Sequence, residues 1–136
     1  MALRVLVADR DSTFLQLVSA HMAWERITVA TATSGLECLS RLRTFAPNVL
    51  VLDPELLWGG GTGVLAAMGE DPQLAGIPVI VVCDHDDIGS FSKLEAPQVR
   101  EYLTKPVSLP ALARTIREVV APANGLVLSD RSSWLN

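Results

Sequence analysis

Five short apolar stretches are the most regular feature of the chain. Each is about as long as a β-strand; they cover residues 3–8, 27–32, 48–53, 77–83 and 99–103, of which the last (VREYL) is the least apolar. Their apolar residues follow one another and do not alternate with polar ones, which predicts strands buried on both faces. Such strands are typical of parallel sheets that carry helices on either side.

The segments between these stretches have the apolar spacing of helices. Residues 12–26 show this spacing, and Ser12 is the expected N-cap. Ser34 and Glu37 form a capping box, which opens a helix. The apolar side of this helix is expected to carry Leu36, Leu39, Leu42 and Phe45. Three further helices are predicted over residues 62–68, 88–96 and 108–121.

Five strands that alternate with five helices predict an α/β fold with a doubly wound parallel sheet. For a chain of 136 residues, the expected form is the flavodoxin-like sheet with strand order 2-1-3-4-5. In this order the switch point lies between the first and third strands, and binding sites form at the carboxyl ends of the strands there.

Several polar residues follow the predicted strands directly. Asp9 follows the first strand, Asp53 ends the third, Cys83 and Asp84 come at the end of the fourth, and Lys105 follows the fifth. Because the carboxyl ends of parallel strands meet at one edge of the sheet, two carboxylates and an ammonium group are expected in one crevice.

Composition and charge narrow the class of protein. Hydrophobic residues make up 49% of the sequence and charged residues 19%, which suits one compact domain. The net charge is -4 and the Lys and Arg residues form no basic run, which argues against nucleic-acid binding. No apolar stretch reaches the roughly 20 residues of a membrane helix, so no membrane partner is expected.

The N-terminal sequence, the cysteines and the C-terminal segment each support a prediction. Acidic residues come too early for a signal peptide, so a cytoplasmic location is expected. The two cysteines, Cys38 and Cys83, are expected to be reduced, with Cys38 packed in a helix. One domain is predicted over residues 1–122, followed by a tail or the start of a linker over residues 123–136.

Four segments together resemble the receiver domain of two-component response regulators, of the kind found in chemotaxis regulators. They are LVADRD at the first strand, VLVLD at the third, IPVIVV followed by CD at the fourth, and EYLTKPVSLPAL running into the last helix. No single segment is specific, but the four occur in the right order and at the right spacing, and the resemblance covers residues 3–121.

The resemblance implies a function and a set of roles. Asp53 would accept a phosphoryl group from a histidine kinase or a phosphotransfer protein, and Lys105 would bind a phosphoryl oxygen. Asp9 and Asp53 would hold Mg²⁺, and Tyr102 would be the aromatic switch residue that changes rotamer on activation. The domain would be a signalling domain and not an enzyme in its own right.

The resemblance also implies an output surface and partners. Phosphorylation would change the surface formed by helix 4, strand 5 and helix 5, which would then bind a downstream protein or a second copy of the chain.

The family pattern is broken first at Arg10. A second acid usually follows the position of Asp9 and touches the metal, whereas here Arg10 follows it. If Arg10 points inward, it can pair with Asp53 bidentately and replace the metal, so that Mg²⁺ binding is weak or absent. Asp11, one residue further on, is expected to help cap the first helix.

Two more departures follow the third and fourth strands. Cys83 stands where the family has a Thr or Ser hydroxyl that binds the phosphoryl group, and a thiol is only a weak donor. Asp84 comes next and is interpreted as a solvated loop acid, with the role of a replacement metal ligand as the alternative. The loop PELLWGGGTG is longer than usual, and its Trp58 is expected to fold back over the sheet edge, with partner contact as the alternative.

Three functional hypotheses follow. The first is a receiver phosphorylated on Asp53, with weak metal affinity. The second is a phosphorylation-independent pseudo-receiver that acts as a protein-interaction module, with Arg10 in the place of the metal or with redox chemistry at Cys83. The third, a flavodoxin-like enzyme or cofactor binder, has no motif in its favour.

The remaining polar residues have ordinary interpretations. Residues 84–87 (DHDD) resemble a metal cluster, but consecutive loop positions rarely converge on one ion, so a solvated turn is expected. His21 lies on a helix among apolar neighbours and is expected to be a partly exposed surface residue.

Overall fold

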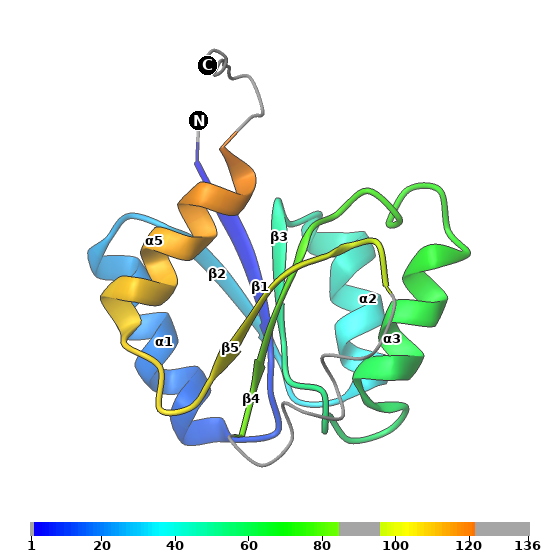
Figure 1. Cartoon of the computed structure of the whole chain (residues 1–136), viewed down its shortest axis with the longest axis horizontal. Helices are drawn as coiled ribbons and strands as arrows, with labels where there is room; N and C mark the ends of the chain where they lie inside the picture. Colours follow the sequence, from blue (N-terminus) through cyan, green and yellow to red (C-terminus); the bar gives the residue numbers. More distant parts are fainter. Residues whose placement is uncertain (1, 85–95, 122–136) are drawn as a thin grey trace.

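The part of the chain that the structure describes forms a central sheet with two helices on each face (Figure 1). This architecture is seen in a computed structural model, which describes residues 2–84 and 96–121. In the view of Figure 1, α1 and α5 cover the left face of the sheet, and α2 and α3 cover the right face.

The sheet has five parallel strands in the order β2-β1-β3-β4-β5, as the sequence predicts. The strands are β1 (Arg4–Ala8), β2 (Thr28–Ala32), β3 (Val49–Leu52), β4 (Val79–Cys83) and β5 (Val99–Thr104). In register, Ala8 of β1 lies beside both Ala32 and Leu52, so the residues that follow β1 and β3 come out side by side.

Four helices are present in the part of the chain that the structure describes. They are α1 (Ser12–Trp24), α2 (Gly35–Phe45), α3 (Gly60–Gly69) and α5 (Leu109–Val120). The fifth predicted helix, over residues 88–96, falls almost entirely outside the described residues, and so does the predicted tail over residues 123–136.

The continuous apolar strands divide their side chains between two cores. Alternate residues of β1, such as Val5 and Val7, pack with α1 and α5, while Leu6 and Ala8 pack with α2 and α3. All four side chains are almost fully buried. The absence of polar alternation in these strands is therefore explained by helices on both faces of the sheet.

Helix α1 is capped by Asp11 rather than by Ser12. Oδ1 of Asp11 accepts hydrogen bonds from the backbone N–H groups of Thr13 (3.0 Å) and Phe14 (3.3 Å). The prediction of Ser12 as the N-cap was wrong by one residue, because Asp11 also reaches the free N–H groups and its carboxylate accepts them more strongly than a hydroxyl. The capping box of α2 is present, with Oγ of Ser34 accepting from the N–H of Glu37 at 3.1 Å.

Two apolar side chains that were expected to pack are exposed. Leu36 is 70% exposed, whereas Leu42 of the same predicted side is buried together with Cys38. Trp58 is 74% exposed, so the prediction that it folds back over the sheet edge was wrong. Its backbone has φ 57°, a left-handed conformation that helps to turn the loop toward α3.

The loop after β3 is fixed against the start of α2. The N–H of Gly35 donates to the carbonyl oxygen of Leu57 at 2.7 Å, and Ser34 and Leu57 form an isolated parallel bridge. A Cβ on Gly35 would lie 2.2 Å from the carbonyl oxygen of Trp58, so only glycine allows this close approach.

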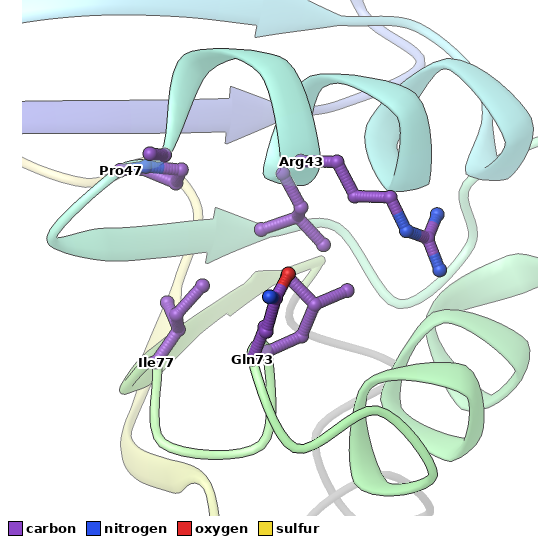
Figure 2. Close-up of a pocket in the computed structure, with 7 residues that line it drawn as sticks. Arg43, Pro47, Gln73 and Ile77 are labelled. Carbon is purple, nitrogen blue, oxygen red and sulfur yellow. The ribbon is translucent and has the colours of Figure 1, made fainter.

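A small hollow lies at the opposite edge of the sheet from Asp53 (Figure 2). It has a volume of about 200 Å³ and is lined by Leu42, Arg43, Ala46, Pro47, Gln73, Leu74 and Ile77. Pro47 precedes β3 and Ile77 precedes β4, so the hollow lies at the amino ends of these strands.

Among the described helices, none is long and apolar enough to cross a membrane.

Candidate functional site

Asp53 lies at the carboxyl end of β3, and its side chain is only 3% exposed. Its backbone N–H donates to the carbonyl oxygen of Ala8, which continues the pairing of β1 with β3. Oδ1 accepts a hydrogen bond from the N–H of Glu55 at 2.9 Å, and Oδ2 accepts one from the N–H of Arg10 at 3.1 Å. The backbone of two different loops therefore holds this carboxylate in place.

Asp9 is the second buried carboxylate at this edge, and Lys105 is its ion partner. Nζ of Lys105 lies 3.0 Å from Oδ2 and 3.2 Å from Oδ1 of Asp9. The pKa of Asp9 is raised above its ordinary value of 3.8, mainly because the carboxyl group is buried. The backbone N–H of Asp11 and the ammonium group of Lys105 lower this pKa, while the negative charge of Asp53 raises it further. The two carboxylates and the ammonium group are thus brought together at one end of the sheet, as predicted.

Arg10 points into this site and contacts Asp53. Its Nε lies 3.4 Å from Oδ2 of Asp53, and its Nη2 donates to Oδ2 of Asp84 at 2.9 Å. One guanidinium therefore joins the residues that follow β3 and β4. The side chain of Arg10 contacts Asp53 through a single nitrogen, and not through two as expected. The reason is that another guanidinium nitrogen, Nη2, is bonded to Asp84.

Cys83 and Tyr102 lie on the neighbouring strands β4 and β5. Cys83 is 1% exposed, and its thiol donates to the carbonyl oxygen of Leu103 at 3.7 Å. Tyr102 pairs with Val81 in register and is half-buried against the core formed with α2 and α3. The phosphate-binding role of Cys83 and the switch role of Tyr102 stay predictions.

The charges at this edge nearly balance. The carboxylates of Asp9, Asp53 and Asp84 meet the cations of Arg10 and Lys105, which leaves one negative charge in excess. A bound Mg²⁺ needs an octahedron of oxygen ligands, and one or two carboxylates usually contribute to it.

The residues present do not fit an ordinary magnesium site. Both oxygens of Asp9 contact Lys105, and Oδ2 of Asp53 contacts Arg10, so fixed cations already lie against the oxygens that a metal would use. Within residues 2–84 and 96–121, no group of three or more His, Cys, Asp or Glu side chains is arranged to hold a metal ion.

Two features of the site were missed by sequence reasoning. Asp84 is 52% exposed, as expected for a solvated loop acid, but it is also the ion partner of Arg10, which was not predicted. Phe14 of α1 places its ring 4.4 Å from Nζ of Lys105, which adds a cation–π contact. Opposite charges directly after β1 and β4, the two strands on either side of β3, are a signal for the first contact; no sequence signal indicates the second.

An apolar groove lies beside Lys105 on the α1 and α5 side. It has a volume of about 500 Å³ and is lined by Phe14, Leu17, Lys105, Pro106, Val107 and Leu109. Because Lys105 belongs both to the groove and to the pair with Asp9, the groove opens next to the acidic site.

His21 lies on α1 outside the acidic site, as expected for a partly exposed residue. Its Nε2 is 2.5 Å from Oε2 of Glu25, and Glu25 also pairs with Arg117 of α5. These three side chains connect the two helices on one face of the sheet.

Comparison with protein-family models decides the relationship. The model of the response regulator receiver domain matches residues 5–117, which include Asp9, Asp53 and Lys105. The chain belongs to the response regulator receiver family. The recognition of the four segments in the sequence is thereby confirmed.

Individual relatives agree with membership of the receiver family. The polar-differentiation response regulator DivK of Brucella ovis is 30% identical over 90 residues, which are 66% of this chain and 73% of DivK. A putative response regulator from Chloroflexus aurantiacus has a TM-score of 0.81 at 22% identity, covering 89% of this chain and 99% of its own. The chemotaxis regulator CheY4 of Vibrio cholerae has a TM-score of 0.79 at 21% identity, over 88% and 99% of the two chains. The two solved structures support the fold alone.

Proposed function

We propose that this receiver domain accepts a phosphoryl group on Asp53 from a histidine kinase or a phosphotransfer protein in the cytoplasm. In this proposal it is a signalling domain and not an enzyme in its own right. The supporting observation is the placement of Asp53, a buried carboxylate at the carboxyl end of β3 with a cation at 3.4 Å. A second cation, Lys105, lies against the neighbouring Asp9.

The chemistry of the step follows from the hydrogen bonds of Asp53. Oδ2 accepts from the N–H of Arg10 and contacts its Nε, whereas Oδ1 has the N–H of Glu55 as its only described donor. Oδ1 therefore keeps a lone pair for attack on phosphorus. The P–N bond of a phosphohistidine breaks as the O–P bond forms, and the imidazole leaves with the electron pair and later takes up a proton.

The groove beside Lys105 supports the choice of phosphodonor. Its apolar lining, which includes Phe14 and Leu17 of α1, suits an apolar helix face of a donor protein, and it opens next to the acidic site. We propose that a helix that carries the phosphohistidine packs here.

The output surface is proposed to include β5 and α5, with Tyr102 as the switch residue and a downstream protein or a second copy as partner. The part of this surface expected from residues 88–96 lies almost wholly outside the described residues. Residues 123–136 are proposed to be a tail or the start of a linker.

One observation favours a second candidate function. The contact of Arg10 with Asp53 is the ion pair expected of a pseudo-receiver, in which a fixed cation keeps the acceptor permanently neutralised. In that case the domain acts as a phosphorylation-independent interaction module, and Asp53 is structural.

Mass spectrometry separates the two candidates. The protein is incubated with acetyl phosphate, and separately with phosphoramidate, in millimolar Mg²⁺, and its intact mass is measured after an acid quench. The phosphoacceptor proposal predicts one added phosphoryl group in the wild type and none in Asp53→Asn. An unchanged mass of the wild type with both donors would favour the pseudo-receiver.

A further inference from the structure

We propose that Arg10 supplies the positive charge that a divalent metal would otherwise supply, so that Asp53 is phosphorylated without a metal ion. This inference rests on the proposed phosphoacceptor function. It assigns to Arg10 the binding of phosphoryl oxygens, and it follows from the poor fit of the site to Mg²⁺.

The position of Arg10 is fixed by its own backbone. Its N–H donates to Oδ2 of Asp53 at 3.1 Å, and its side chain returns to the same oxygen through Nε at 3.4 Å. Both contacts are on one oxygen, so Oδ1 is left for attack on phosphorus. Arg10 therefore holds the non-attacking oxygen of Asp53, where a cation stabilises the carboxylate without blocking its nucleophilic oxygen.

The guanidinium also has donors left for a ligand. Nε contacts Asp53 and Nη2 contacts Asp84, while Nη1 has no partner among the residues described in the structure. The Arg10 side chain is 35% exposed, so this nitrogen is within reach of an incoming anion. A planar guanidinium can bind two oxygens of a phosphoryl group at once.

Asp84 can give way to the phosphoryl group. Its side chain is 52% exposed, and an ion pair this exposed contributes only about 0–1 kcal/mol. Exchange of the Asp84 carboxylate for a phosphoryl oxygen on Nη2 therefore costs little. In the phosphorylated state, Arg10 would bind the phosphoryl group through Nη1 and Nη2.

Lys105 completes the neutralisation. In the described state it neutralises Asp9, with Nζ 3.0 Å from Oδ2. The transferring phosphoryl group is then flanked by one cation that follows β1 and another that follows β5. Fixed cations aimed at the developing charge are the main source of acceleration in phosphoryl transfer.

The proposed step is balanced with acetyl phosphate as donor. Oδ1 of Asp53 forms a bond to phosphorus, the bond between phosphorus and the acetyl oxygen breaks, and acetate leaves with the electron pair of that bond. No proton, oxidant or metal is consumed.

The test measures the rate of phosphorylation by acetyl phosphate in excess EDTA and in millimolar Mg²⁺, from intact masses over time. The wild type is expected to react at similar rates in both. Arg10→Gln removes the cation without adding a ligand, and its rate is expected to fall about 100-fold in both conditions. Arg10→Asp adds a third carboxylate, so it is expected to react only with Mg²⁺.

Arg41→Gln is the matched control. The Arg41 side chain is 46% exposed and is paired with a carboxylate, as that of Arg10 is, but it lies on α2 with Glu37, so this variant should react like the wild type. Circular dichroism shows whether each variant is folded.

Two results would overturn the inference, and they differ in what else they affect. If the wild type reacts only with Mg²⁺, or if Arg10→Gln reacts in EDTA as fast as the wild type, Arg10 does not replace the metal, while Asp53 stands as the acceptor. If the wild type does not react in either condition, with acetyl phosphate or with phosphoramidate, the proposed function fails as well.

Discussion

Arg10 meets Asp53 through both its backbone and its side chain, with the N–H 3.1 Å and Nε 3.4 Å from the same carboxylate oxygen. The contact places a fixed cation against a carboxylate that is otherwise buried. It also links the loop after β1 to the end of β3, and through Asp84 to the end of β4. The chemistry and the stability of the site should therefore both depend on this residue.

Replacing Arg10 by Gln should lower the free energy of unfolding by about 1 kcal/mol at neutral pH. The side chain of Asp53 is 3% exposed and would lose its cation but keep its two backbone donors, which limits the loss. Urea denaturation measures the change. Arg41→Gln should change stability by less than about 0.5 kcal/mol; equal losses in the two variants would show that the contact with Asp53 has no special weight.

Replacing Asp9 by Asn should stabilise the fold at neutral pH and have less effect in acid. Burial raises the folded-state pKa of Asp9 above 3.8, so ionisation of this residue disfavours folding. The protonated form of Asp9 stabilises the fold. This stabilisation is fully present below the ordinary pKa of an aspartate and is lost as the pH rises through the pKa of Asp9 in the folded state.

The advantage of Asp9→Asn over the wild type should therefore grow between about pH 3 and pH 7 in urea titrations. A constant difference over this range would contradict the raised pKa. Asp9→Asn also removes the ion partner of Lys105, which lowers stability equally at all pH values where Asp9 is ionised. The double variant Asp9→Asn with Lys105→Met separates this loss from the stabilisation that comes from removing a buried carboxylate.

Gly35→Ala and Gly63→Ala should change stability in opposite directions. A Cβ on Gly35 would lie 2.2 Å from the carbonyl oxygen of Trp58, so this variant should lose about 1–3 kcal/mol as the loop is displaced. Gly63 is exposed in α3, and a Cβ added there would meet nothing within 4 Å, so alanine should add about 0.5–1 kcal/mol. Thermal melts of the two variants check both signs, and a stable Gly35→Ala would mean that the loop is not fixed against α2.

Ala46→Gly should raise the melting temperature slightly. Ala46 ends α2 in a left-handed conformation with φ 53°, which glycine adopts without a steric penalty. The expected gain is about 0.5 kcal/mol, because the added freedom of glycine in the unfolded chain offsets part of the relief. A lower melting temperature would indicate that the methyl group of Ala46, beside the hollow in Figure 2, contributes packing.

The sheet was predictable from the sequence because each strand can be recognised from its own short run of residues. Apolar runs marked the strands, although the run of β5 (VREYLT) is interrupted by two charged residues, and a chain of this size with alternating elements allows few strand orders. The presence of Asp9, Asp53 and Lys105 at one edge followed from this order alone.

The contacts inside the site were less predictable, because they depend on loop geometry. Arg10 and Asp84 are 74 positions apart. They can pair only if the loops that follow β1 and β4 bring the two side chains toward each other. Leu36 and Trp58 show the same limit: helical spacing and hydrophobicity predicted burial, but both side chains are exposed.

Mapping the modified residue shows whether Asp53 is the phosphoacceptor. The protein is treated with acetyl phosphate and then with borohydride, which reduces an aspartyl phosphate to homoserine, and its peptides are sequenced by tandem mass spectrometry. We expect homoserine at position 53 and at no other position. Homoserine at Asp9 or Asp84, or unmodified peptides throughout, would contradict it.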